Sequence, residues 1–284
     1  MSFIQKAFRN LHPIAQLALI ICASGTAMIF GVLATLILVG QDPLLMNSVG
    51  LAFGGAAGGI IYTYLLSDGR GVGINSENKS KNLLLFLLGS VAIALLFSPI
   101  MDLSYRLNKW LLVEGSSIYN IAKNIEDLAF VETKNLLNLD SPGAFVMTLI
   151  GIALVPAIFE EYLFRGAIQP LMAKWTGNIH AGIWMSAFMF SFIHFQFFGL
   201  LPRMLLGAMF GYLLIWSGSI YTSMLAHFAN NATVVAAAYI LGPEWIDENL
   251  DPSSTQIESV DYLITLGTAT VSYTHLTLPT IYSV

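Results

Sequence analysis

Residues 144–165 read AFVMTLIGIALVPAIFEEYLFR, a segment apolar enough for the interior of a lipid bilayer until it reaches Glu160 and Glu161. A charged side chain near the centre of a bilayer costs at least ~2.5–3.5 kcal/mol on insertion scales, so such residues usually face a cavity and take part in function. Two imidazoles follow in similar surroundings, His194 in FMFSFIHF and His227 in SMLAHFANN. Carboxylates and imidazoles inside a membrane helix bundle indicate acid–base chemistry at that place.

The composition of the whole chain is typical of a membrane protein. Of its 284 residues 56% are hydrophobic and only 10% are charged, whereas a soluble domain carries about 25% charged residues. The mean hydropathy is +0.72. Several apolar stretches reach ~20 residues, the length at which a helix crosses a bilayer. We therefore predict an all-α fold, a polytopic transmembrane helix bundle.

The apolar stretches predict seven complete spans plus a truncated eighth. In the second of them Gly50, Gly54 and Gly58 recur at intervals of four, a spacing of small residues that lets helices pack closely in lipid. The lysine and arginine bias of the loops favours a cytoplasmic N-terminus, in what we expect to be a bacterial plasma membrane. The predicted spans are 14–39, 44–66, 83–101, 143–165, 180–198, 201–217, 219–241 and a truncated one from 262.

Three short motifs carry a resemblance to a known family. EEYLFR at 160–165, FSFIH at 190–194 and HFANN at 227–231 match the patterns Glu-Glu-x-x-x-Arg, Phe-x-x-x-His and His-x-x-x-Asn. In this order they resemble the CPBP family of intramembrane proteases, which includes the CAAX prenyl protease type II, bacteriocin-processing and Abi-like proteins. The resemblance covers roughly 143–235 and implies a membrane endopeptidase.

The resemblance also implies a role for each motif residue. Glu160 would be the general base that activates water, assisted by His194, while His227 and Asn231 would stabilise the oxyanion of the tetrahedral intermediate. Peptide hydrolysis needs such groups, because a base must take a proton from water and donors must face the developing negative charge. For Glu160 to meet both imidazoles inside the bilayer, the fourth helix must project beyond the membrane near 143–148 and continue past Arg165 towards Gln169.

Three further residues are assigned supporting roles. Glu161 and Arg165 are four apart with the acid first, the favourable order for an ion pair on one helix face. Such a pair lets both charges exist within a bundle. Phe190, the first residue of the second motif, is the third supporting residue.

The choice between a glutamate-type and a metal-dependent protease is left open by the residues. Glu160, His194 and His227 are candidate ligands, because two histidines and a carboxylate resemble a catalytic zinc set with one position for water. Glutamate-activated water needs no cofactor, and we favour it. A divalent metal such as zinc is the alternative.

The chain divides into four parts. Residues 1–142 hold N-terminal spans and an amphipathic loop, 143–241 the catalytic core, and 242–270 an acidic loop with the truncated last span. The string VSYTHLTLPT at 271–280 resembles a translated transposon sequencing adaptor. We therefore expect 271–284 to be an artefact and the natural chain to continue through a complete last span.

The expected partners are a peptide or membrane-protein substrate and the lipid bilayer. No basic stripe indicates binding to nucleic acid, and the oligomeric state is open. The main alternative to the enzyme is a non-catalytic membrane scaffold or bacteriocin-immunity protein of the same fold. A transporter with a carboxylate proton relay is a third class, but the sequence has no inverted repeat that would favour it.

Overall fold

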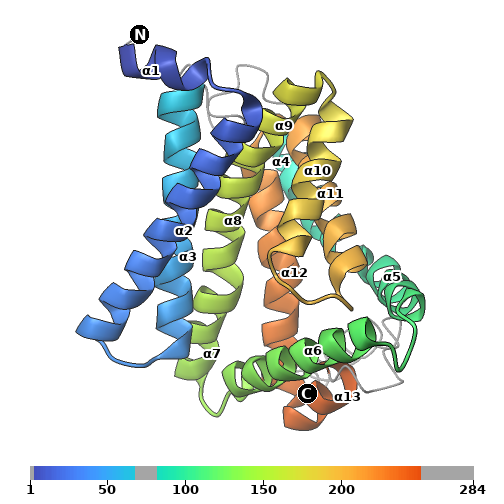
Figure 1. Ribbon diagram of the computed structural model, residues 1–284. Coiled ribbons are helices and arrows are strands. Elements are labelled where there is room, and N and C mark those ends of the chain that lie inside the picture. The colour runs from blue at the N-terminus through green and yellow to red at the C-terminus, as the bar shows by residue number, and fades with distance from the viewer. Residues whose placement is uncertain (1–2, 68–81, 251–284) are drawn as a thin grey trace, which may run out of the picture.

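The computed structural model describes residues 3–67 and 82–250, and within these ranges every regular element is a helix and no strand occurs (Figure 1). The predicted all-α class is confirmed. The predicted truncated span from 262 and the expected artefact at 271–284 lie outside the described residues, as does 251–270 of the predicted acidic loop.

The helices include three π-helical segments, labelled η, in which the hydrogen bonds reach one residue further than in an α-helix. In chain order the elements are α1 (Phe3–Arg9), α2 (Pro13–Leu38), α3 (Pro43–Ile61), η1 (Tyr62–Leu66), α4 (Leu83–Leu96), α5 (Ser98–Leu111), α6 (Ser117–Leu137), α7 (Pro142–Thr148), η2 (Leu149–Leu154), α8 (Val155–Leu163), η3 (Phe164–Ile168), α9 (Gln169–Thr176), α10 (Ile179–Phe192), α11 (Leu200–Ser217), α12 (Ile220–Leu241) and α13 (Pro243–Leu250).

Within the described part of the chain, 5 helical segments are long and apolar enough to cross a membrane. They indicate an integral membrane protein. The third of them joins α7, η2, α8, η3 and α9 into one helical segment of 35 residues. The five segments are Pro13–Leu38, Pro43–Leu66, Pro142–Thr176, Leu200–Ser217 and Ile220–Leu241.

The predicted count of seven complete spans plus a truncated eighth is not confirmed. α4 and α5 give a sixth span only if they are counted together, and they meet at 42°. Pro99 lies in the first turn of α5 and has no N–H to donate back into α4, which explains the break between them. The predicted span 180–198 also changes, because α10 is 14 residues long and ends at Phe192.

Glycines of α3 bring it into close contact with two neighbouring helices. A Cβ on Gly54 would lie 3.0 Å from the carbonyl oxygen of Ser24 in α2. On the other side of α3, a Cβ on Gly55 would lie 2.3 Å from the carbonyl oxygen of Phe159 in α8. A Cβ at Gly55 does not fit without movement of α8, and one at Gly54 would be unusually tight against α2, so the two glycines allow α2, α3 and α8 to pack closely.

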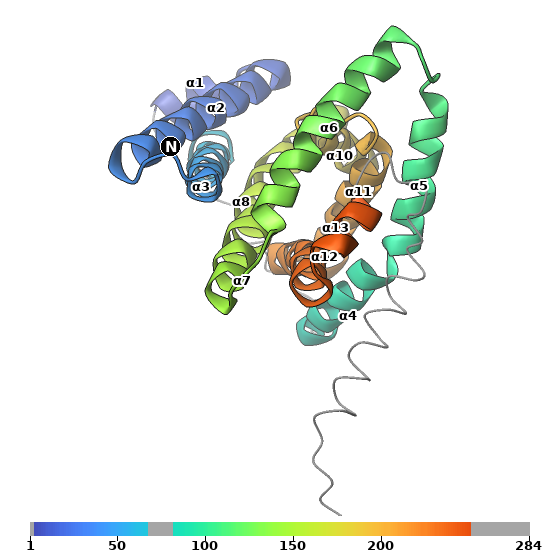
Figure 2. The same ribbon diagram turned by 90° about the horizontal axis from the view of Figure 1, so that it is seen from below.

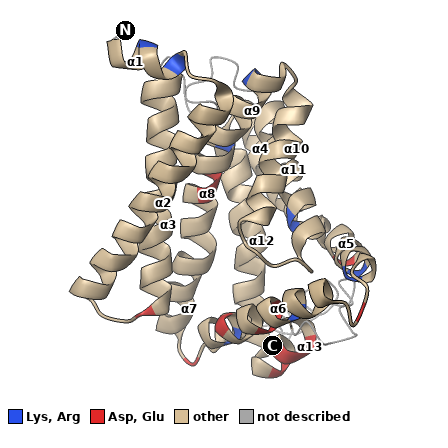
Figure 3. Ribbon diagram, viewed as in Figure 1, with Lys and Arg blue, Asp and Glu red and all other residues tan. Residues whose placement is uncertain are grey.

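Helix α6 lies across one end of the bundle, running from the side of α5 to α7 (Figure 2). It buries Glu126 and Leu137 and exposes Ile121 and Leu128. Charged positions gather at the ends of the spans and on α5, α6 and α13, whereas α8 carries acidic positions in the middle of the bundle (Figure 3). The cytoplasmic placement of the N-terminus stays a prediction.

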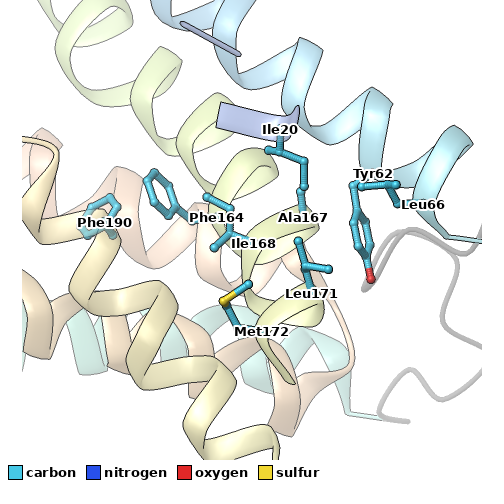
Figure 4. Packing of buried hydrophobic residues seen from close by; sticks show 9 residues of the cluster. All are labelled: Ile20, Tyr62, Leu66, Phe164, Ala167, Ile168, Leu171, Met172 and Phe190. Atoms are coloured by element: carbon cyan, nitrogen blue, oxygen red, sulfur yellow. The ribbon is translucent and has the colours of Figure 1, made fainter. Parts of the chain in front are cut away.

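A buried apolar cluster supports the helical segment that follows the two glutamates. Phe164, Ala167 and Ile168 of η3 pack with Ile20 of α2 and Phe190 of α10 (Figure 4). This cluster therefore links the N-terminal helices to the helices that carry the motif residues. Its other members are Tyr62, Leu66, Leu171 and Met172.

Candidate functional site

The two glutamates lie in α8, near the middle of the 35-residue helical segment Pro142–Thr176. The segment continues past Arg165 to Thr176, beyond the predicted edge at 165. The π-helical η2 and η3 flank α8 on both sides. Such wide turns are often found at functional sites, because one extra residue per turn changes which side chains face a neighbouring helix.

A hydrogen bond next to Pro156 joins α12 to the helical segment that carries the glutamates. Pro156 has no backbone N–H, so the π-helical turn before it, which contains the carbonyl of Ile152, lacks one helical donor. The Nδ2 of Asn231 in α12 donates to this carbonyl at 3.2 Å. Asn231 is therefore anchored to the helix that carries the glutamates, and its Oδ1 accepts from Asn230 at 3.1 Å.

Glu161 is the centre of a buried charge network. Arg165 donates to its Oε1 at 2.9 Å, and the Nδ1 of His227 donates to the same oxygen at 3.0 Å. The side chains of Arg165 and Glu161 are 1% and 0% exposed. Arg165 also donates to the backbone oxygen of Gly207 in α11 at 2.6 Å. A buried ion pair needs such extra hydrogen bonds to offset the loss of hydration.

Two phenylalanines enclose this network. The Arg165 guanidinium lies 4.9 Å from the ring centre of Phe190 and 5.3 Å from that of Phe210. The imidazole of His227 is stacked on Phe210 with centroids 4.9 Å apart, and it meets Phe190 edge-on at 5.9 Å. Cation–π contacts of this kind strengthen when water is absent.

Glu160 occupies a different environment from its neighbour. Its Oε2 lies 3.9 Å from the Nε2 of His227, and its side chain is 13% exposed. The distance is too long for a direct hydrogen bond. Because Glu161 holds the other ring nitrogen, Nε2 is the nitrogen that faces Glu160. A water molecule to one side of the pair, about 2.8 Å from each atom, would bond both.

His194 lies just beyond the end of α10, in the connection to α11. Its Nδ1 bonds the carbonyl oxygen of Phe190 at 2.7 Å, and its ring packs edge-on against Phe190 at 5.2 Å. Within the described residues it forms no hydrogen bond or ion pair with Glu160. The structure therefore brings Glu160, His227 and Glu161 together directly and places His194 beside them through Phe190.

The sequence reasoning missed Phe210 and the role of Gly207. A Cβ on Gly207 would lie 3.2 Å from both Arg165 Nη2 and Phe190 Cδ1, so the glycine makes room for the guanidinium. The four-residue spacing of Gly207 and Gly211 was a signal for close packing, but not for contact with a charge. For Phe210 the sequence contains no signal that separates it from other core aromatics.

The candidate metal ligands do not form a three-residue set. Within 3–67 and 82–250 no group of three or more His, Cys, Asp or Glu side chains is arranged to hold a metal ion. Of the three candidates, Glu160 and His227 face each other, while His194 bonds a backbone carbonyl. In this part of the chain the three candidates are thus not arranged as a set of three ligands, and no catalytic step is assigned to a metal.

A cavity of about 360 Å³ lies between α4, α5, α6, α11, α12 and α13, and its lining includes none of Glu160, His194, His227 and Asn231. Asn230, the neighbour of Asn231, forms part of its wall. Its lining is mostly apolar, with Glu126 and Arg203 among the charged groups.

Comparison with known proteins agrees with the motifs. Residues 142–233 match the family described as type II CAAX prenyl endopeptidase, Rce1-like. The resemblance to CPBP-type proteases is thereby confirmed for this segment. No curated protein and no solved structure matches the chain.

Proposed function

We propose that this membrane protein, which carries a type II CAAX prenyl endopeptidase-like segment at 142–233, hydrolyses peptide bonds inside the bilayer with Glu160 as general base. The match itself indicates a membrane endopeptidase. The observation that carries the proposal is the contrast between the two adjacent glutamates. Glu161 is fully enclosed and bonded through its Oε1 to Arg165 and His227, whereas the side chain of Glu160 is 13% exposed and lies 3.9 Å from His227.

In the proposed reaction Glu160 takes a proton from water, and the water oxygen attacks the peptide carbonyl. The carbon–oxygen double bond opens and negative charge collects on that oxygen. His227 and the amide of Asn231 then donate to the oxyanion, and Glu160 returns the proton to the leaving amine as the carbon–nitrogen bond breaks. His194 assists from the other side of Phe190.

Charge balance supports the donor role of His227. Its Nδ1 donates to Glu161, so a donor at Nε2 requires the doubly protonated ring. With that ring cationic, two carboxylates, Glu160 and Glu161, would be balanced by Arg165 and His227. A neutral cluster is the form that an apolar bundle tolerates best.

The cavity of about 360 Å³ is lined by Asn230 but by none of the proposed catalytic residues, so the proposal does not rest on it. We propose a peptide or membrane-protein substrate, the bilayer as surroundings, a bacterial plasma membrane as location and a cytoplasmic N-terminus.

The test is turnover of an internally quenched peptide library by the purified protein in liposomes. Glu160→Gln keeps the size of the side chain but removes the base, so we expect a loss of about 10²–10⁴-fold with unchanged thermal stability. Glu132→Gln, on the exposed face of α6, is the matched control and should cleave like the wild type. Cleavage by Glu160→Gln at the wild-type rate would favour the scaffold or immunity alternative.

A further inference from the structure

The connection between α10 and α11, residues 193–199, has a backbone conformation that needs external support. Phe195, directly after His194, has φ 54° and is the one non-glycine residue with positive φ in the described ranges. For a bulky side chain this conformation is unfavourable and persists only where surrounding contacts hold it. The position of His194 therefore depends on what binds this connection.

Two buried polar side chains from the preceding helices bind it directly. Glu126 of α6 accepts a hydrogen bond from the backbone N–H of Phe198 at 2.9 Å. Asn108 of α5 donates to the backbone oxygen of Phe198 at 3.0 Å and to that of Phe197. Both residues lie outside the family-matched segment 142–233.

Burial shows that these contacts are not incidental surface bonds. Glu126 is 7% exposed and Asn108 9%, on two helices whose other faces expose many apolar residues. Phe198, which both of them bind, is itself 1% exposed. A buried carboxylate without its donor would be costly, so α6 and the connection hold each other in place.

Other hydrogen bonds hold the two ends of the connection together but do not reach α5 or α6. Arg203 at the start of α11 donates to the side-chain and backbone oxygens of Gln196 at 2.7 and 2.5 Å. Ser191 of α10 donates to the backbone oxygen of Leu200 at 2.6 Å. These bonds fix the shape of the turn, whereas Glu126 and Asn108 fix its place relative to α5 and α6.

We propose that Glu126 and Asn108 are positioning residues that hold the connection 193–199 so that His194 stays against Phe190 beside Glu160 and His227. The proposal rests on the proposed function, because it assigns the two residues to the same site. It makes the surface helices α5 and α6 part of the catalytic arrangement. Misplacement of a catalytic group by about 1 Å lowers the rate by up to ~10²-fold.

Three variants in liposomes test this. Glu126→Leu removes the acceptor, Glu126→Gln keeps a carbonyl oxygen of the same reach, and Glu132→Leu is the control on the exposed face of α6. We expect Glu126→Leu to lower kcat by about 10²-fold with little change in KM. Glu126→Gln and Glu132→Leu should retain most of the wild-type kcat. Equal kcat for Glu126→Leu and Glu132→Leu would overturn the proposal.

A second variant shows whether the effect runs through His194. Adding Glu126→Leu to His194→Ala should lower kcat no further, because the group being positioned is already missing. A full, multiplicative loss in the double variant would mean that Glu126 acts on stability or on another group, and would reject the positioning role.

Hydrogen exchange separates this proposal from the proposed function. The amides of His194 and Phe195 are bonded to the carbonyl oxygens of Ser191 and Phe192. In Glu126→Leu they should exchange faster than in Glu132→Leu, whether or not a cleavable peptide is found. Equal exchange in the two variants rejects the positioning role. Faster exchange in Glu126→Leu together with no Glu160-dependent cleavage by the wild type rejects the proposed function instead.

Discussion

The Nδ1 of His227 lies 3.0 Å from the Oε1 of Glu161, and this bond joins α12 to α8 at the centre of the bundle. It determines which ring nitrogen is left to face Glu160. The same oxygen accepts from Arg165 at 2.9 Å. The enclosed glutamate thus orients the imidazole, while Glu160 lies 3.9 Å from it, too far for a direct hydrogen bond.

Removing the charge of Glu161 should destabilise the protein and inactivate it. In Glu161→Gln the guanidinium of Arg165, 1% exposed, loses its partner, and breaking a buried pair costs about 3–5 kcal/mol. Unfolding in detergent and peptide turnover measure the two effects. Adding Arg165→Gln should restore part of the stability but not the turnover. Equal stability of the single and double variants would contradict the buried-pair explanation.

Asn231→Ala should lower kcat by about 10²–10³-fold, the usual effect of removing one oxyanion donor. In the wild type one N–H of the Asn231 amide is bonded to the backbone oxygen of Ile152. The second N–H of the same amide is the donor for the substrate. Tyr239→Phe on the same helix keeps the ring that stacks on Phe145 and should retain full turnover. If KM rises while kcat stays, Asn231 binds substrate instead.

Gly55→Ala should destabilise the packing of α3 against α8. The added Cβ would lie 2.3 Å from the backbone oxygen of Phe159, next to Glu160, and such overpacking costs about 1–3 kcal/mol. Gly25→Ala in α2 is the control, since a Cβ there meets nothing within 4 Å. It should stabilise the helix by roughly 0.5–1 kcal/mol. Thermal unfolding of both variants in detergent distinguishes them.

The stability of the protein should depend on pH through Glu126. Burial is the main cause that raises the pKa of this carboxyl, opposed by Arg203 and by the N–H groups of Phe198 and Gly199, with Asp127 raising it further. A raised folded-state pKa means that the folded state binds the proton more tightly than the unfolded state does. The contribution of protonated Glu126 to folding stability is therefore complete at low pH and is lost as pH rises through the folded-state pKa.

Glu126→Gln cannot ionise, and it should therefore be more stable than the wild type at about pH 8, with the difference shrinking towards about pH 4. Urea unfolding in detergent across this range measures it. Glu132→Gln should follow the wild type at every pH. A wild type that gains stability relative to Glu126→Gln on raising the pH would show that the carboxylate form is the favoured one.

The sequence allowed the helical class and the motif residues to be predicted, but not the helix ends. Hydropathy does not distinguish an apolar connection from the last turns of an apolar helix. Residues 193–198 were therefore included in a predicted span, although α10 ends at Phe192. Sequence spacing placed Glu161 and Arg165 on one face, and the structure joins them. The sequence does not show that Glu161, and not Glu160, bonds the Nδ1 of His227, because this depends on how α8 and α12 are rotated about their axes.

The missing N–H of Pro156 has a consequence for how this site can change in evolution. A residue other than proline at 156 would supply a backbone donor to the π-helical turn that contains the oxygen of Ile152, where Asn231 now donates at 3.2 Å. That donor would compete with Asn231 for the carbonyl oxygens of this turn. We therefore expect positions 156 and 231 to co-vary among relatives. Replacement of the proline should be tolerated only where residue 231 no longer donates to the oxygen of Ile152.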